Sequence, residues 1–174
     1  MKKAFTLIEL LTVIAIFSLV SGTIVGIFIS AVSAQRKILA TQEMLSQISY
    51  VLEYMGRAIR MAKKDLDGNC IPQKTNYYQA TTSEIKFENS KGKCQRFFLD
   101  QNQIKEEKAG TILPLTSGIK INSLKFNITG KDQPPVDDWQ PRVTISIEAE
   151  GRGKNPPKIQ IQTSVSQRDL DVEE

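Results

Sequence analysis

The side chains that could carry chemistry in this sequence are few. The chain has 174 residues and contains no histidine. It therefore lacks the commonest general base, the usual metal ligand and every Ser–His or Cys–His nucleophile pair. No other set of residues forms a recognisable catalytic group, so the sequence predicts a protein that is not an enzyme.

The two cysteines, Cys70 and Cys94, lie too far apart for a Cys-x-x-Cys motif. Each lies in a segment that a turn could bring beside the other. Outside the cytosol, a disulfide is the simplest interpretation of such a pair. For a loop of this length, the loss of chain entropy in the unfolded state predicts roughly 3 kcal/mol of stabilisation.

Asp65, Asp67 and Asn69 place oxygen atoms at alternate positions, which is how an EF-hand calcium loop begins. The rest of that motif is missing. Cys70 stands where the loop needs glycine, and Asn76 stands where it needs glutamate. We therefore predict a turn that ends a helix, with no metal site and no cofactor, and keep calcium binding as the alternative.

Glu9 is a carboxylate within an otherwise apolar segment. Residues 10–35 carry no charge, and a helix of about 20 such residues crosses a bilayer. A carboxylate there costs several kcal/mol unless it is paired or protonated, and a simple anchor has no use for one. Glu9 therefore either serves something other than anchoring, or it is an accidental or protonated side chain near the membrane interface.

The N-terminus resembles the prepilin signature of type IV pilins and type II secretion pseudopilins. A short basic leader, residues 1–4, precedes Phe5, and Glu9 is the fifth residue counted from Phe5. The resemblance implies that a prepilin peptidase cuts between Ala4 and Phe5 and that the new amine of Phe5 is N-methylated. Ala4 replaces the usual glycine, and both are small. In the family, the amine pairs with the glutamate of a neighbouring subunit, which neutralises that carboxylate.

The apolar segment also has an interpretation as an ordinary secretory signal. Residues 32–34, Val-Ser-Ala, imitate a cleavage site, although the segment is longer than the apolar region of about 7 to 15 residues in such signals. Charge does not decide the orientation, because basic pairs at 2–3 and 36–37 flank both sides. The resemblance implies a cytoplasmic leader and a C-terminal region outside the cytoplasm, where a disulfide persists.

Small residues recur at every fourth position of the apolar segment, at Ser18, Gly22, Gly26 and Ser30. Such a stripe lets the backbone of another helix approach closely. Glycine and serine are also tolerated in membrane helices that have no packing partner. The stripe is thus a candidate helix-packing face, with simple tolerance as the alternative.

An amphipathic pattern follows, with apolar residues at three- and four-residue steps from Leu45 onward, which predicts that the helix continues through residues 36–66. These residues are Ile38, Leu45, Ile48, Leu52, Met55, Ile59 and Ala62. A helix over residues 5–64 would be about 90 Å long, so its second half must pack on the rest of the chain. Arg57 and Arg60 could pair with acids there, contact a partner subunit, or lie in solvent.

The remainder alternates apolar and polar residues in five segments, which predicts an antiparallel sheet with one face in water. The segments are 84–88, 95–99, 123–128, 142–148 and 158–165. Turn residues at 89–92 and 151–157 separate the first two and the last two. A long helix packed on a small antiparallel sheet is an α+β, pilin-like architecture, and this prediction is independent of the leader.

Four parts are therefore expected: a leader (1–4), a membrane-spanning helix half (5–35), an amphipathic stem (36–66) and an outward-facing β-rich region (67–174). Residues 52–62 and 162–168 look like segments of the larger minor pilins and pseudopilins, the W and J types. The predicted function is a structural subunit of a type IV pilus, type II secretion or competence filament. The alternative is a single-pass, membrane-anchored domain that binds an external ligand and never enters a filament.

The resemblance also implies partners and a location. The partners are other pilin or pseudopilin subunits, the prepilin peptidase that also methylates, an inner-membrane assembly platform and membrane lipid. The implied location is the inner membrane before assembly and a filament afterwards. The net charge is +4, but the basic residues alternate with acids instead of forming a stripe, so nucleic acid is not indicated as a partner.

Overall fold

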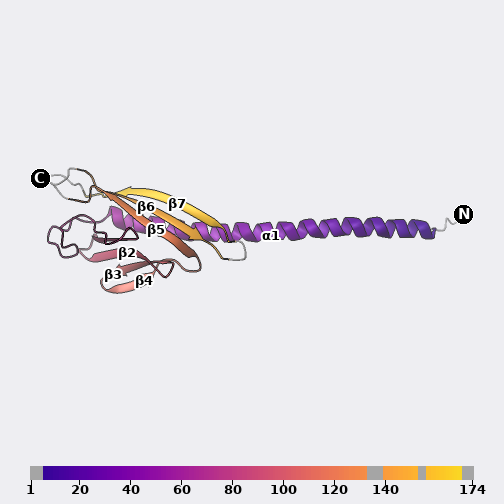
Figure 1. The fold of residues 1–174 in the computed structure, drawn as a ribbon, viewed down its shortest axis with the longest axis horizontal. Helices are drawn as coiled ribbons and strands as arrows, with labels where there is room; N and C mark the ends of the chain where they lie inside the picture. The colour runs from indigo at the N-terminus through magenta and orange to yellow at the C-terminus, as the bar shows by residue number, and fades with distance from the viewer. Residues whose placement is uncertain (1–5, 133–138, 153–155, 170–174) are drawn as a thin grey trace. The chain divides into compact units, whose positions relative to one another are not determined.

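The computed structural model describes residues 6–132, 139–152 and 156–169. Within these ranges the chain forms one long helix followed by strands (Figure 1). The elements are α1 (Leu7–Arg60), β1 (Glu84–Glu88), β2 (Cys94–Asp100), β3 (Gln103–Lys108), β4 (Thr111–Pro114), β5 (Lys120–Thr129), β6 (Arg142–Glu150) and β7 (Lys158–Ser166). This is the predicted α+β, pilin-like architecture, which is confirmed.

The chain divides into two compact units, Met1–Leu39 and Ala40–Glu174. In the first unit, the described residues of α1 present apolar side chains on every side, including Phe17 and Phe28. The most apolar stretch of α1 is long enough to cross a membrane, and none of it is buried. Such a surface requires a lipid or protein cover that the described chain does not provide.

In the second unit, α1 buries one stripe of side chains, at Met44, Ile48, Val51, Leu52, Met55, Gly56 and Ile59. The predicted stripe was partly wrong, because Ile38 is 56% exposed and Leu45 is 38% exposed. Met44 and Val51, which the prediction missed, are buried instead. Successive residues point about 100° apart around a helix, so a face centred on Met44 turns its neighbour Leu45 towards solvent.

The helix ends at Arg60, earlier than the predicted stem, which runs to residue 66. Donors from other elements bind the last carbonyl groups, which have no partner within a helix. The Tyr77 hydroxyl donates to the Ile59 carbonyl at 2.9 Å, and the Arg168 N–H donates to the Arg60 carbonyl at 2.8 Å. Lys63 already pairs with Glu88 in an isolated β-bridge. The helix therefore stops before the turn residues that were expected to end it.

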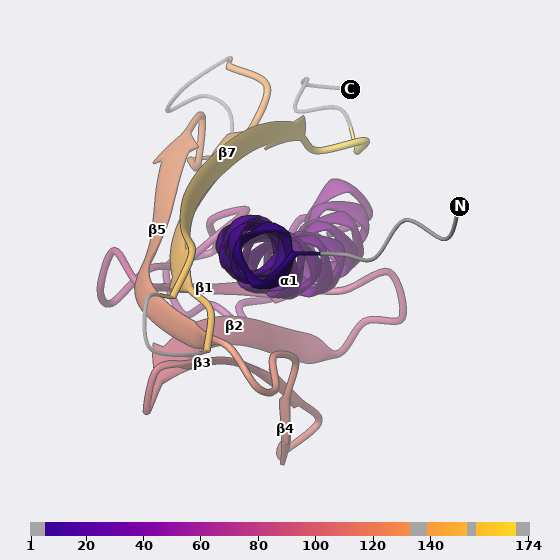
Figure 2. The same ribbon diagram turned by 90° about the vertical axis from the view of Figure 1, so that its right-hand side faces the viewer.

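The strands form two antiparallel sheets, one with the order β1-β2-β3-β4 and one with the order β5-β6-β7. One sheet was predicted, so the division is a correction. The five predicted strands and the predicted turn at 89–92 are present, whereas β3 and β4 were missed. Part of the other predicted turn, 151–157, lies outside the described residues. Both sheets lie around the second half of α1, with β5 and β7 on one side and β1 to β3 below in Figure 2.

The core of the second unit lies between α1 and both sheets. Tyr77, Phe87 and Phe97 are its largest fully buried side chains. The Phe87 ring lies 6.2 Å from the Tyr77 ring and 5.8 Å from the Phe97 ring, measured between centroids. These aromatic contacts join the segment before β1 to β1 and β2. The core thus holds the end of α1 in a fixed place on the sheets.

Candidate functional site

The start of α1 is organised by Thr6 and Glu9. The Glu9 N–H donates to the Thr6 hydroxyl oxygen at 3.3 Å. In return, the Thr6 N–H and the Thr6 hydroxyl each donate to Glu9 Oε2 at 2.9 Å. This reciprocal pair is a capping box, with Thr6 as the N-cap of a helix that begins at Leu7. Glu9 therefore stabilises the first turn of its own helix.

Glu9 was predicted to act in subunit assembly or to have no role, and the capping role was missed. The signal for it was present, because Thr-x-x-Glu before an apolar run is a capping-box signature. Ala4 and Phe5 lie outside the described residues. Cleavage between them, methylation of Phe5 and pairing of its amine with Glu9 stay predictions.

The stripe of Ser18, Gly22, Gly26 and Ser30 lies on the uncovered part of α1. The Ser18 hydroxyl donates to the Ile14 carbonyl at 2.8 Å, and the Ser30 hydroxyl donates to the Gly26 carbonyl at 3.0 Å. A Cβ atom at Gly22 or Gly26 would meet nothing within 4 Å. The hydroxyl groups are thus satisfied within the helix, and the space beside the glycines is open to another helix. The packing role of the stripe stays a prediction.

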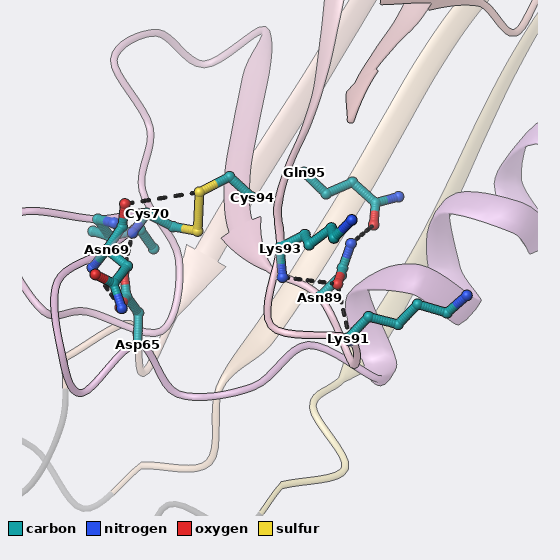
Figure 3. The surroundings of a disulfide bond; sticks show 9 residues. Asp65, Asn69, Cys70, Asn89, Lys91, Lys93, Cys94 and Gln95 are labelled. Atoms are coloured by element: carbon teal, nitrogen blue, oxygen red, sulfur yellow. Dashed lines mark hydrogen bonds between the residues drawn. A yellow bond between two sulfur atoms is a disulfide. The ribbon is translucent and has the colours of Figure 1, made fainter. Parts of the chain in front are cut away.

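Cys70 and Cys94 form the predicted disulfide, which is confirmed (Figure 3). Their Cα atoms lie 5.3 Å apart, within the usual range for a disulfide. Cys94 is the first residue of β2, and Cys70 lies in the loop that follows α1. The bond therefore ties this loop to the sheet that packs on the helix.

Asp65 organises the loop that carries Cys70. Its buried carboxylate accepts hydrogen bonds from the N–H groups of Asn69 at 3.0 Å, Cys70 at 2.8 Å and Ile71. The turn is therefore present, with Asp65 as its central acceptor (Figure 3). The prediction that this turn ends the helix is wrong, because α1 already ends at Arg60.

The loop also brings donor atoms of Asp65, Cys70 and Glu88 within 4.8 Å of one another. The Cys70 sulfur is already bonded to Cys94, which removes the thiolate that a metal would need. The disulfide and the Asp65 turn thus account for the closeness of these three side chains. Burial is the main cause that raises the pKa of Glu88 above its usual value, and the charge of Asp65 adds to it.

A buried polar network joins α1 to the first sheet, and it was not predicted from the sequence. Glu106 on β3 is only 6% exposed. Its carboxylate accepts hydrogen bonds from the Tyr54 hydroxyl at 2.8 and 3.0 Å and from Gln95 Nε2 at 2.6 Å. Asn89 Nδ2 donates to Gln95 Oε1 at 3.2 Å. The network fixes the position of the helix on the sheet.

The Tyr54 phenol responds to this environment. Removal from water, followed by the hydrogen bond to Glu106 and the Glu106 charge, raises its pKa to about 12. Tyr54 is therefore neutral at ordinary pH and serves as a hydrogen-bond donor to the carboxylate. This contact is structural and offers no general acid or base near neutrality.

The long apolar helix with a capped start, packed at its other end on antiparallel sheets, defines a pilin-like protein. Residues 1–25 match the family model of the prokaryotic N-terminal methylation motif, which is a type IV pilin and pseudopilin signal. No curated protein and no solved structure matches the chain.

The motif supports a pilin- or pseudopilin-like subunit and implies processing by a prepilin peptidase and assembly with other pilin subunits. Pilin-like proteins are in general structural rather than enzymatic. Together with the apolar helix, the motif suggests a protein that is first anchored in a membrane and then associated with a filament.

Proposed function

We propose that this protein is a minor pilin or pseudopilin, a low-copy subunit that helps to start or cap a filament of the type IV pilus, type II secretion or competence class. The observation that carries the proposal is the methylation motif at residues 1–25, of which residues 7–25 belong to a helix whose apolar surface is uncovered. A lipid bilayer can cover that surface before assembly, and the helices of neighbouring subunits can cover it afterwards.

The minor-subunit role is supported by the two stretches that resemble the W and J types, residues 52–62 and 162–168. In the structure they pack on each other. A Cβ atom at Gly56 would lie 3.3 Å from Val165 Cγ2. The Arg168 N–H donates to the Arg60 carbonyl at 2.8 Å, and Gln167 Nε2 donates to the Ala62 carbonyl at 3.1 Å. The two resemblances thus concern one packed unit instead of two unrelated stretches.

The mechanism is assembly through the helix. Cutting after Ala4 would create a cationic amine at Phe5, and Glu9 of a neighbouring subunit would neutralise it in the apolar layer. The Ser18, Gly22, Gly26 and Ser30 stripe would allow a neighbouring helix to approach closely. In this proposal the inner membrane holds the subunit with its C-terminal region outside the cytoplasm, until the assembly platform transfers it to the filament.

Two measurements test the proposal. Mass spectrometry of the mature protein is expected to find an N-methylated Phe5 at its start. Deletion of the gene is expected to lower the number of filaments or to abolish the secretion, adhesion, motility or DNA uptake that depends on them. An uncut Met1 or a start at Gln35, with unchanged filaments in the deletion strain, would favour a membrane-anchored or secreted binding domain instead.

A further inference from the structure

Three hollows meet at the end of α1, and Met61 lines all of them. Met61 is 40% exposed, although it is apolar. The hollow between the helix and the β1–β2 turn measures about 220 Å³. A water molecule occupies about 30 Å³ of liquid, so this hollow is large enough for side chains of a partner.

The charges around these hollows are strongly unequal. Among the residues that the structure describes, two acids, Glu53 and Asp169, line them, and Arg57 already binds Glu53 at 2.8 Å. Six cations from the same described ranges line them: Arg57, Arg60, Lys63, Lys91, Lys108 and Arg168. We call these six residues and Met61 the basic end surface. This surface is predominantly basic, whereas along the sequence basic residues alternate with acidic ones, as at residues 105–108.

The fold holds the cations of this surface in place from four separate segments. Arg57 and Arg60 lie in the last turn of α1, and Lys108 ends β3. Lys91 lies on the β1–β2 turn, where its N–H donates to Asn89 Oδ1 at 2.9 Å (Figure 3). Asn89 in turn belongs to the Glu106 network through Gln95. The arrangement is thus built by the core and is not a chance run of basic residues.

An apolar floor accompanies the charge. Tyr54 and Ala58 line the same hollow as Met61, Lys91 and Lys108. A ligand that fits must therefore combine negative charge with an apolar side chain. An acidic peptide segment has both features, whereas a nucleic acid backbone offers phosphate charge without an apolar side chain to cover Met61.

We propose that the basic end surface binds an acidic segment of a neighbouring filament subunit, with an apolar side chain on Met61 and carboxylates against Arg57, Lys91 and Lys108. The inference rests on the proposed function, since it places the partner in the same filament. The proposed contact lies on the second unit and is additional to the contacts expected along the apolar half of α1. Electrostatic complementarity of this kind selects one partner over others.

Photo-crosslinking in the filament-forming cells tests the inference. Ser90 is exposed and lines two of the hollows, so p-benzoylphenylalanine replaces Ser90 in the full-length chain. We expect a crosslink to an acidic, apolar-containing segment of another filament subunit, mapped by mass spectrometry. With Lys108→Glu in the same chain, the yield should fall about fivefold or more, because attraction becomes repulsion.

Lys125→Glu is the matched control. Lys125 is also an exposed lysine on a strand, but it lies on β5 outside the three hollows. The control changes the net charge by the same amount and should leave the crosslink yield unchanged. Formation of the Cys70–Cys94 disulfide in both variants shows that both chains fold.

Several outcomes would overturn the inference. These are equal yields in the two variants, a crosslink that nuclease removes, a crosslink only to lipid, or one only to residues 170–174 of the same chain. A different result would contradict the proposed function itself: the chain would be neither cut before Phe5 nor isolated with filament subunits. The inference would then be wrong as well, because it rests on that function. Processing and co-isolation with equal yields contradict the inference alone.

Discussion

At the residue scale, Glu9 has two roles that are compatible in geometry. Both hydrogen bonds from Thr6 end on Glu9 Oε2. A carboxylate has two oxygens with about four acceptor sites, so Oε1 retains the capacity for a second donor. The capping box can therefore hold the side chain in position while a cationic amine of a neighbouring subunit approaches the other oxygen.

Substitution of Glu9 separates these roles. Glu9→Gln keeps an oxygen for the capping box but loses the charge, whereas Glu9→Ala loses both, at a cost of about 1 kcal/mol for the cap. We expect normal cutting before Phe5 in both variants and reduced co-isolation of both with filament subunits. If the Gln variant co-isolates as well as the wild type, the charge pairing is wrong and capping is the role of Glu9.

Glu88 gives a pH dependence with a definite sign. Its pKa in the fold is raised above the ordinary value of 4.5. Well below pH 4.5 the carboxyl is neutral in both folded and unfolded chains. As the pH rises through 4.5 to the folded pKa, the unfolded chain ionises first, so the folded state loses stability. Ionised Glu88 therefore opposes folding at pH 7.

Thermal unfolding of Glu88→Gln in the full chain measures this effect. The Gln variant should unfold at a higher temperature than the wild type at pH 7, because it has no charge to remove from water. The difference should shrink towards zero below pH 4.5. A Gln variant that is less stable than the wild type at pH 7 would mean that ionised Glu88 makes a favourable contact instead.

At the element scale, the contact between α1 and β7 depends on a small residue. Gly56 is buried on α1, and a Cβ atom there would lie 3.3 Å from Val165 Cγ2 on β7. That separation is tighter than an ordinary side-chain contact. Gly56 is thus needed for close packing, in contrast to Gly26, beside which the space is open.

Substitution of Gly56 and of Gly26 by leucine compares a helix face that packs on a strand with one that is open. Gly56→Leu should destabilise the second unit by roughly 1–3 kcal/mol, because the added atoms have no room between helix and sheet. Gly26→Leu should leave unfolding of that unit unchanged. Chemical denaturation of the full chain in detergent, followed by near-UV signals of the buried aromatic residues, measures both. Equal effects of the two substitutions on stability would show that Val165 moves aside at little cost and that Gly56 is not needed for close packing.

The elements differ in how far the sequence alone could define them. Periodicity predicted a helical stem and five strands that the structure contains, because alternating or helical burial is written in the residue types, but it misplaced part of the buried stripe of α1. Strand β3 was missed because Lys-Glu-Glu-Lys at 105–108 looks like a solvated loop. Its Glu106 is buried only because Tyr54 and Gln95, distant in sequence, donate to it. Contacts between distant residues also end the helix at Arg60 and could not be predicted locally.

Of the candidate site, too, only the parts that depend on local sequence could be predicted. The disulfide and the motif at the N-terminus were found from residue types and spacing. The basic end surface was not, because its cations come from 57–63, 91, 108 and 168 and only the fold brings them together. Arg57 and Arg60 were noticed in the sequence, but a sequence does not show which other cations join them.

At the scale of the whole molecule, the two units require different surroundings. The first has an uncovered apolar helix that suits a bilayer or a bundle of similar helices. The second has a closed core and a disulfide, which persists in an oxidising compartment. The proposed orientation, with the second unit outside the cytoplasm, meets both requirements at once.

The state of the two cysteines tests that orientation. In exported protein, intact mass and nonreducing gels should show the Cys70–Cys94 bond and no thiols open to alkylation. When export of the C-terminal region is blocked, both thiols should react, because the cytosol keeps them reduced. The Cys70→Ser, Cys94→Ser double variant should lose roughly 3 kcal/mol of stability. Two reactive thiols in exported wild-type chain would place the second unit in a reducing compartment and contradict the proposed orientation.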